Sequence, residues 1–299
     1  MKTTFLALSF AVLAATLHAQ APQPDFSKVE IKTTKISDTF YTLEGQGGTI
    51  GVLVGADGIF MVDSQFAPLS QKIAAAIHQI SDKPVRFMVN THVHGDHTGG
   101  NENFAKMGAT IFSRDELRWR LAHPSPAANG APGVPAPAVA LPVVTYEGPV
   151  TIHMDGEDVH LIPIHRAHTD GDTLVYFPSN DVLMTGDYFR SIQYPNIDRV
   201  NGGSLDGMLE GLGVTIGMAG PKTKIIPGHG PTVDRTALTA HRDMILVVRD
   251  KVAALVQQGK TVDEVLAAKP TSDYDAIVPN SSTTSERFVR QLYAELKTN

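Results

Sequence analysis

The chain has 299 residues, of which 42% are hydrophobic and 19% are charged, a balance typical of a soluble globular protein with ample material for a buried core. Its formal net charge of −6 argues against nucleic acid as a partner, because such binding depends on Lys and Arg side chains that neutralise phosphates. There is no cysteine, which excludes disulfide bonds, thiolate metal ligands and a thiol nucleophile.

The N-terminal segment differs from the rest of the chain. A lysine precedes a short apolar run, 5–17, and small and polar residues follow it. This order is typical of a secretory signal peptide, and the run is too short to span a bilayer comfortably. We predict a signal peptide over 1–19, with cleavage after Ala19 or Ala21, and a single-domain mature protein over 20–299 that is periplasmic or secreted and free of the membrane. A retained membrane anchor is the alternative.

The first part of the mature chain has the pattern of an α/β protein. Residues 29–63 contain strand-like runs separated by Gly and Asp-Gly. Residues 67–82 have the apolar spacing of an amphipathic helix, and 84–91 form a mostly apolar segment typical of a strand buried on both faces. A helix, a strand and a second helix are then expected at 101–108, 109–113 and 114–124.

Residues 124–142 are rich in Pro and Ala and have no periodicity. This segment is expected to be a long surface excursion or a flap over a substrate cleft, with equal weight. Strands, a helix, a strand and a mostly helical tail follow at 144–148, 150–155, 157–164, 172–178, 181–187, 205–219, 222–228 and 235–297. This order of elements predicts two sheets packed together with helices outside.

The segment "THVHGDHTGG", 91–100, concentrates three histidines and an aspartate in six residues. His92 and His94 are two apart, so on an extended backbone they project to one side, and Gly95 is expected to permit a sharp turn that brings Asp96 and His97 to the same point. Imidazole and carboxylate are ligands that zinc takes in proteins. The spacing favours a metal site over an accidental cluster on a solvated loop.

This segment resembles the signature of the metallo-β-lactamase superfamily. The resemblance implies an αββα sandwich of two mixed β-sheets, with a one- or two-metal site at the ends of its strands. It also implies three further ligands downstream, each beside a strand and in fixed order. His168, Asp187 and His229 stand at such places, so the resemblance covers residues 29–231 and includes most of the mature chain.

Carried onto this sequence, the resemblance implies two zinc ions, although iron and manganese also accept these donors. The first metal is expected to be held by His92, His94 and His168. The second is expected to be held by Asp96, His97 and His229, with Asp187 shared between the two. A hydroxide that bridges the metals is the expected nucleophile, because coordination lowers the pKa of water toward ~7. Asp96 is the candidate catalytic residue that orients this group or relays its proton.

Other residues near the motifs have weaker signals. Asp63 ends an apolar run and matches an acidic position of the family, so we expect it to orient a ligand histidine; a turn-forming role is the alternative. Asp170 and Asp172 are expected to solvate their loop, His165 to be structural and Ser204 to cap the next helix. Four residues are candidates to line the substrate cleft, namely Tyr188, Arg190, Tyr194 and Asn196.

We expect an exported zinc hydrolase that acts on a small-molecule ester, lactone or amide. β-Lactamase activity, if present, is expected to be weak, because members of the superfamily with a bridging acid such as Asp187 resemble the glyoxalase II and lactonase branches. Two alternatives stay open. One is an iron-dependent oxidoreductase of the same fold, similar to persulfide dioxygenases, with a single metal held by His92, His168 and Asp187. The other is a non-catalytic periplasmic protein that only keeps the metal site.

Overall fold

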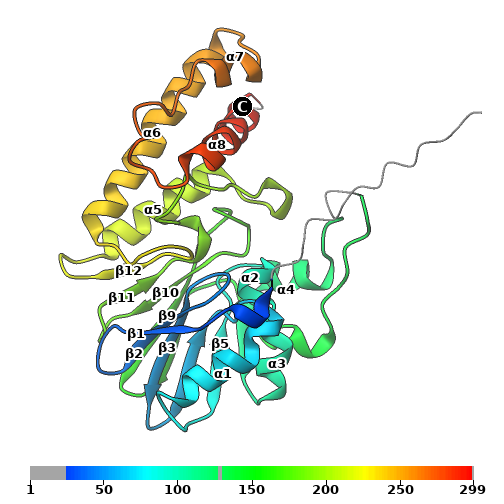
Figure 1. Ribbon diagram of the computed structural model, residues 1–299, viewed down its shortest axis with the longest axis vertical. Coiled ribbons are helices and arrows are strands. Elements are labelled where there is room, and N and C mark those ends of the chain that lie inside the picture. The colour runs from blue at the N-terminus through cyan, green and yellow to red at the C-terminus, as the bar shows by residue number, and fades with distance from the viewer. Residues whose placement is uncertain (1–24, 127–129, 298–299) are drawn as a thin grey trace, which may run out of the picture.

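The computed structural model describes residues 25–126 and 130–297. The predicted signal peptide over 1–19 and both candidate cleavage positions lie outside the described residues. Two β-sheets pack face to face, and helices cover both outer faces (Figure 1). Among the described residues, no helix is both long enough and apolar enough to span a bilayer.

The first sheet has seven strands in chain order, β1 (Lys32–Lys35), β2 (Phe40–Glu44), β3 (Ile50–Gly55), β4 (Gly58–Val62), β5 (Val85–Val89), β6 (Thr110–Arg114) and β7 (Val144–Tyr146). Its first four strands pair antiparallel, and β4 to β7 pair parallel. Every residue of β4 is buried, as its unbroken apolar sequence requires, because both faces of this sheet are covered.

The second sheet has five strands in the order β12-β11-β10-β9-β8. Their bounds are β8 (Val150–Met154), β9 (Glu157–Pro163), β10 (Thr173–Phe177), β11 (Val182–Met184) and β12 (Lys224–Ile226). β8 to β11 form an antiparallel meander, and β12 joins the edge parallel to β11. Both sheets are therefore mixed, as the sequence predicted.

Three apolar clusters separate the layers. One lies between the two sheets and includes Phe40, Phe60 and Phe177, whose rings pack against one another. A second lies under α1 (Ser70–His78) and α3 (Asn101–Lys106), on the outer face of the first sheet. Ile73 and Ile77 of α1 are four residues apart and face this cluster, which is the spacing of an amphipathic helix.

The third cluster covers the outer face of the second sheet. It joins strand residues such as Leu183 to α5 (Leu205–Met218), α6 (Arg235–Gln257) and α8 (Ser281–Leu296). Figure 1 shows α6 and α8, with α7 (Val262–Ala267) between them in sequence, extending away from the sheets at the opposite side from α1. The predicted αββα architecture is confirmed.

Local sequence signals explain several helix boundaries. Ser204 accepts a hydrogen bond from the Gly207 backbone N–H and caps α5, as predicted. Thr261 and Glu264 form a reciprocal capping box at the start of α7. The helix predicted over 67–82 is shorter in the structure, because a 3-10 turn precedes α1 and α1 ends at His78.

Candidate metal centre

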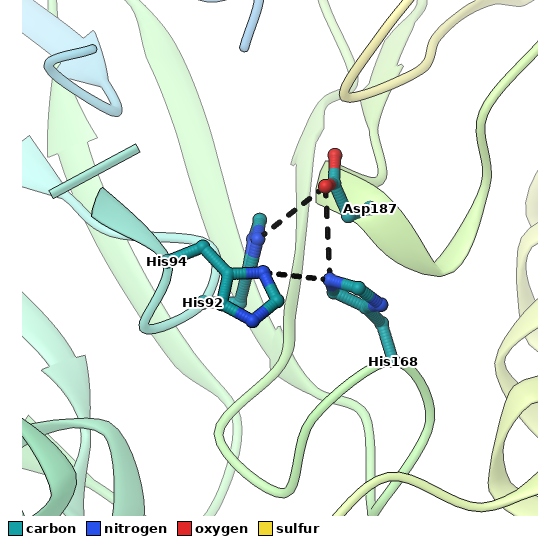
Figure 2. Close-up of side chains that lie close together, drawn as sticks. All are labelled: His92, His94, His168 and Asp187. Atoms are coloured by element: carbon teal, nitrogen blue, oxygen red, sulfur yellow. Dashed lines mark hydrogen bonds and ion pairs between the residues drawn. The ribbon is translucent and has the colours of Figure 1, made fainter. Parts of the chain in front are cut away.

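Seven side chains with metal-binding donors converge where strands of both sheets end. His92, His94, His168 and Asp187 form one group, and in each group the donor atoms lie within 4.8 Å of one another (Figure 2). The second group is formed by Asp96, His97, Asp187 and His229. Asp187 belongs to both groups. The structure thus brings together all seven residues that the sequence predicted as ligands.

These residues come from four segments of the chain, the first of which is 92–97. His92 and His94 follow β5, while Asp96 and His97 lie in the short helix α2 (Gly95–Thr98). The remaining three, His168, Asp187 and His229, lie respectively before β10, after β11 and after β12. The expected role of Gly95 is wrong: it begins α2 with an ordinary backbone conformation, and the first turn of this helix redirects the chain.

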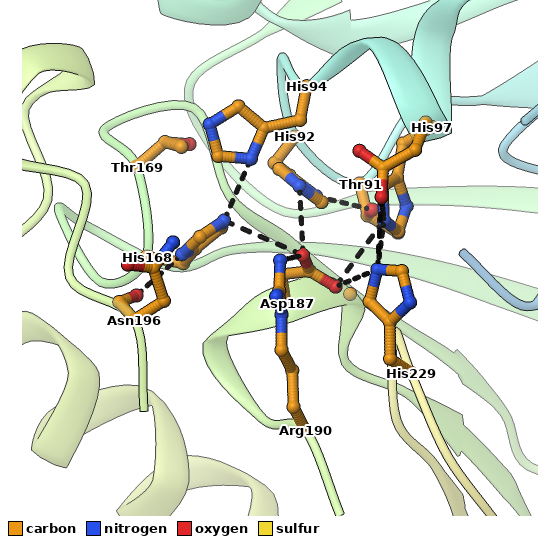
Figure 3. A network of polar contacts seen from close by, with 12 residues as sticks. Thr91, His92, His94, His97, His168, Thr169, Asp187, Arg190, Asn196 and His229 are labelled. Atoms are coloured by element: carbon orange, nitrogen blue, oxygen red, sulfur yellow. Dashed lines mark hydrogen bonds and ion pairs between the residues drawn. The ribbon is translucent and has the colours of Figure 1, made fainter. Parts of the chain in front are cut away.

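His97 and His92 are oriented by a buried carboxylate and a hydroxyl group. Asp63 Oδ2 lies 2.7 Å from His97 Nδ1 and also accepts from the Thr91 hydroxyl at 2.7 Å. Since that hydroxyl donates to Asp63, its lone pair is free to accept from His92 Nδ1 at 3.1 Å (Figure 3). Asp63 therefore lies where a residue that orients a ligand histidine must lie.

His94 and His168 are oriented by a different segment. His94 Nε2 lies 2.7 Å from Asp198 Oδ2, and His168 Nδ1 lies 2.6 Å from the backbone oxygen of Asn196. Carboxylate and carbonyl oxygens only accept, so these ring nitrogens are the donors. In the neutral, metal-binding form of His92, His94, His97 and His168, the other nitrogen carries the lone pair, and it faces the centre of the site.

The inward-facing atoms fit divalent cations. His92 Nε2 is buried and makes no hydrogen bond with the described residues, while Asp187 Oδ1 is buried within 3.3 Å of His97 Nε2 and 3.4 Å of His229 Nε2. The inner nitrogens of His94 and His168 are 3.0 Å apart, and two lone pairs at that distance repel unless a cation lies between them. A buried nitrogen left without a hydrogen bond is costly, and so are crowded donor atoms, so this arrangement fits metal ligation.

The protonation of the first group favours metal binding. Burial lowers the pKa of His92 well below its usual value and lowers the pKa of His168 to about 3. Both imidazoles are therefore neutral near pH 7, which is the form that binds a metal.

The second group pairs carboxylates with histidines whose pKa values they raise. Burial acts to raise the pKa of Asp187, but the nearby cationic groups of His97 and Arg190 outweigh it and lower that pKa well below the usual value. Burial acts to lower the pKa of His97, but the carboxylates of Asp187 and Asp63 raise it well above the usual value. The site attracts positive charge, and a divalent cation supplies it in place of protons.

Comparison with known proteins agrees with this geometry. The family model of the metallo-β-lactamase superfamily matches residues 43–229, which is more than half of the chain and includes all seven donors. The chain belongs to the metallo-β-lactamase superfamily. The matched family and the αββα fold confirm the predicted superfamily and architecture, and the His/Asp donor set fits a divalent-metal site.

Individual relatives of this superfamily member are distant. A linear primary-alkylsulfatase from Pseudomonas sp. (strain ATCC 19151) is 21% identical over 286 residues, covering 79% of this chain and 53% of the relative. The solved sec-alkylsulfatase from Pseudomonas sp. has a TM-score of 0.65 at 18% identity, covering 88% of this chain and 50% of that one. The metallo-β-lactamase from Pontibacter korlensis has a TM-score of 0.56 at 20% identity, with 72% and 99% coverage. The chain spans about half the length of the alkylsulfatases it matches.

A cavity of about 470 Å³ opens beside the metallo-β-lactamase motif, at His94 and Gly95. One wall is made by the Pro/Ala-rich segment, including Pro124, Val134 and Ala136. The opposite wall is the 3-10 turn Arg199–Asn201 with Asp198 before it. The described part of residues 124–142 is mostly exposed and also lines this cavity, so it fits a surface excursion, and its role over a substrate cleft stays a prediction.

Two of the four residues predicted to line the cleft do not reach it. Tyr188 and Tyr194 are 1% and 0% exposed, and their hydroxyl groups bond to Thr215 and Asp275 in the α-helical layer. They are core residues because each large ring fills the cluster over the second sheet. The prediction that they contact substrate is wrong.

The other two cleft candidates have different places. Arg190 contacts Asp187 through its guanidinium group and so lies at the metal centre (Figure 3). Asn196 turns its side chain toward Gln291 of α8, and its contribution to the site is the backbone oxygen that holds His168. Asn196 therefore orients His168 through its backbone, and its side chain does not point to the metal centre.

The sequence interpretation underestimated Asp172 and Asp170 and missed Asp198. Asp172 was expected to solvate its loop, but it is buried and accepts hydrogen bonds from the backbone N–H groups of His168 and Thr169. Burial raises its pKa to about 7, against the lowering effect of these donors. Asp170 is partly exposed and paired with Arg120 at 2.5 Å. Asp198 carried no recognised motif, and its role depends on a contact 104 residues away in sequence.

Proposed function

We propose that this chain is an exported zinc-dependent hydrolase that acts on a small ester, lactone or amide. The observation that carries the proposal is the convergence of seven His and Asp donors into two groups that share Asp187. Export is proposed from the basic, apolar and small-residue order of the N-terminal segment. Nucleic acid is not proposed as a substrate because the chain is acidic overall.

His92, His94 and His168 would hold one cation, and Asp96, His97 and His229 would hold the other, with Asp187 common to both. When bound, the metal pair supplies a nucleophile from water at neutral pH and polarises the oxygen of the scissile group. Zinc is proposed because a set of imidazoles and carboxylates without cysteine suits it.

Asp96 is the side chain proposed to orient the attacking group or to relay its proton. Asp96 has a side chain that is 23% exposed, and its Oδ2 lies 3.1 Å from His229 Nε2. Burial acts to raise the pKa of Asp96, but the hydrogen bond from His229 and the charge of His97 lower it to about 2. Asp96 is therefore ionised at neutral pH and open to water, so it can accept a hydrogen bond at the mouth of the site.

An anionic alkyl ester is a second candidate substrate. The relatives that match this chain over 79% and 88% of its length are alkylsulfatases. Arg190 brings a guanidinium group to the metal centre, which favours a substrate with a negative charge. The cavity beside His94 has Val93, Leu121 and Val134 among its walls, which suit an apolar chain. An alkyl sulfate ester combines these features.

The decisive test combines metal analysis with a substrate panel. The purified chain is expected to contain about two zinc ions and to hydrolyse members of a panel of carboxylic esters, lactones, alkyl sulfates and nitrocefin-type lactams. Tight iron binding with oxygen consumption on a persulfide would favour the oxidoreductase alternative instead. Two bound zinc ions without turnover of any panel member would favour the non-catalytic alternative.

A further inference from the structure

Residues 194–198 form a segment without regular secondary structure. It contacts the outer ring nitrogens of two ligands of the first metal group, His168 and His94. Within this segment, here called the strap, the Asn196 oxygen accepts from His168 Nδ1 at 2.6 Å and Asp198 accepts from His94 Nε2 at 2.7 Å. The Asp198 backbone N–H also donates to the His168 oxygen at 2.9 Å. The position of the strap therefore decides where two of the inner nitrogens point.

The strap is held from its other side by helix α8. The Gln291 side chain is central to this contact: its Oε1 accepts from the Ile197 backbone N–H at 3.1 Å, and its Nε2 donates to Asn196 Oδ1 at 2.9 Å. At the start of the strap, the Tyr194 backbone N–H donates to the Thr284 hydroxyl at 3.3 Å. The Tyr194 ring also stacks on Phe288, with ring centres 5.8 Å apart and planes at 13°.

Packing fixes only part of the strap: Ile197 is buried in the cluster over the second sheet, whereas Asn196 is half-buried. A cavity of about 720 Å³ lies between residues 196–200 and α8, and Gln291 is part of its wall. On the side that faces this cavity, close packing does not hold Asn196, so its hydrogen bonds contribute to its position. Gln291 is placed to do this because one side chain bonds two consecutive residues of the strap.

We propose that α8 is a positioning element of the first metal group and that Gln291 is its positioning residue, an inference that rests on the proposed metal centre. α8 lies outside residues 43–229, the part matched by the family model. The second metal group has separate support, since His97 is held by Asp63. The α8 contacts are thus expected to affect the first metal and to leave the second unchanged.

The test is a metal titration of Gln291→Met, which keeps the side-chain length and removes both hydrogen bonds. Tyr293→Phe is the matched control, because it removes one hydrogen bond from α8 to the Lys260 backbone oxygen, away from the strap. We expect Gln291→Met to weaken one of two zinc affinities about tenfold, the lower end of the cost of losing an outer partner of a ligand. The absorption spectrum of the cobalt-loaded variant is expected to change at that site only. Tyr293→Phe is expected to match the wild type in both readouts.

The outcomes separate this inference from the proposed function. If the wild type binds two zinc ions and Gln291→Met binds both as tightly as Tyr293→Phe does, the role of α8 is refuted. If the wild type itself binds no zinc, the proposed metal centre fails first. Should Gln291→Met not fold, Gln291→Glu keeps the acceptor for Ile197 and loses the donor to Asn196, so the same selective loss at one site is expected; equal affinities would again refute the role.

Discussion

At the scale of single residues, the site is organised by which nitrogen of each histidine faces outward. The outer ring nitrogen of each histidine donates a hydrogen bond to one acceptor, namely Asp63, the Thr91 hydroxyl, the Asn196 oxygen or Asp198. The inner nitrogens are then left with lone pairs directed at a common centre. These outer partners come from three stretches of sequence. Thr91 lies in the motif and Asp63 was predicted, whereas Asn196 and Asp198 lie 28 and 104 residues from the histidines they hold and had no such signal.

The first prediction compares two histidines that are three residues apart. His168→Ala is expected to remove one donor of the first group and to lower hydrolysis more than about 100-fold, beyond the usual cost of losing an outer partner. His165 has an exposed side chain, so His165→Ala is expected to keep most of the activity. Turnover and zinc content of the two variants check this. Equal losses from both would show that the ligand has been misassigned.

At the scale of elements, the loops after β11 and β12 approach each other closely enough to exclude side chains. A Cβ atom on Gly228 would lie 1.9 Å from Asp187 Oδ1 and 2.7 Å from the Gly186 carbonyl carbon. The Gly228 backbone N–H also donates to the Gly186 oxygen at 2.8 Å. The glycine thus permits the parallel strands to present Asp187 and His229 side by side.

The second prediction follows from this close approach. Gly228→Ala is expected to displace the shared carboxylate, to reduce zinc binding at both sites and to destabilise the fold by about 1–3 kcal/mol, the usual cost of overpacking. Gly213→Ala is the control: it lies within α5, and a Cβ atom there meets no described atom within 4 Å. That change is expected to be neutral or to stabilise by about 0.5–1 kcal/mol. Zinc content and denaturant unfolding report metal binding and stability for both variants. A Gly228→Ala protein with two bound zinc ions would contradict the prediction.

At the scale of the whole molecule, the metal centre joins the two sheets. Its donors follow β5 in the first sheet and β11 and β12 in the second. Bound metal therefore links both layers in the native state, whereas the unfolded chain cannot hold His168, Asp187 and His229 beside the 92–97 segment. There is no cysteine in the chain to provide a covalent link instead.

The third prediction is that metal removal lowers the thermal stability. A ligand present at about 1,000 times its Kd stabilises the native state by roughly 4 kcal/mol, which for a chain of this size corresponds to a Tm shift of about 5–10 °C. Calorimetry before and after chelation, with zinc content measured in parallel, checks this. Adding zinc back is expected to restore the Tm, and a Tm that is the same with and without bound zinc would contradict the role of the metal in joining the sheets.

Much of this molecule was predictable from the sequence because the signals are local. The unbroken apolar run of β4, the spacing of Ile73 and Ile77 in α1 and the Ser204 cap depend on neighbours within a few residues. The seven donors were predictable for a related reason: each lies within a short motif beside a strand. Local periodicity and motif spacing survive in a single sequence.

Tertiary structure alone decided what surrounds those donors. Tyr188 and Tyr194 follow Asp187 closely in sequence, yet the packing of α5 and α8 turns them into the core. Asp172 is buried by the His168 turn, and Asp198 and Gln291 act through contacts about 100 residues apart. Burial and long-range hydrogen bonds depend on how the layers pack, and that arrangement exists only once the two sheets and the C-terminal helices have come together.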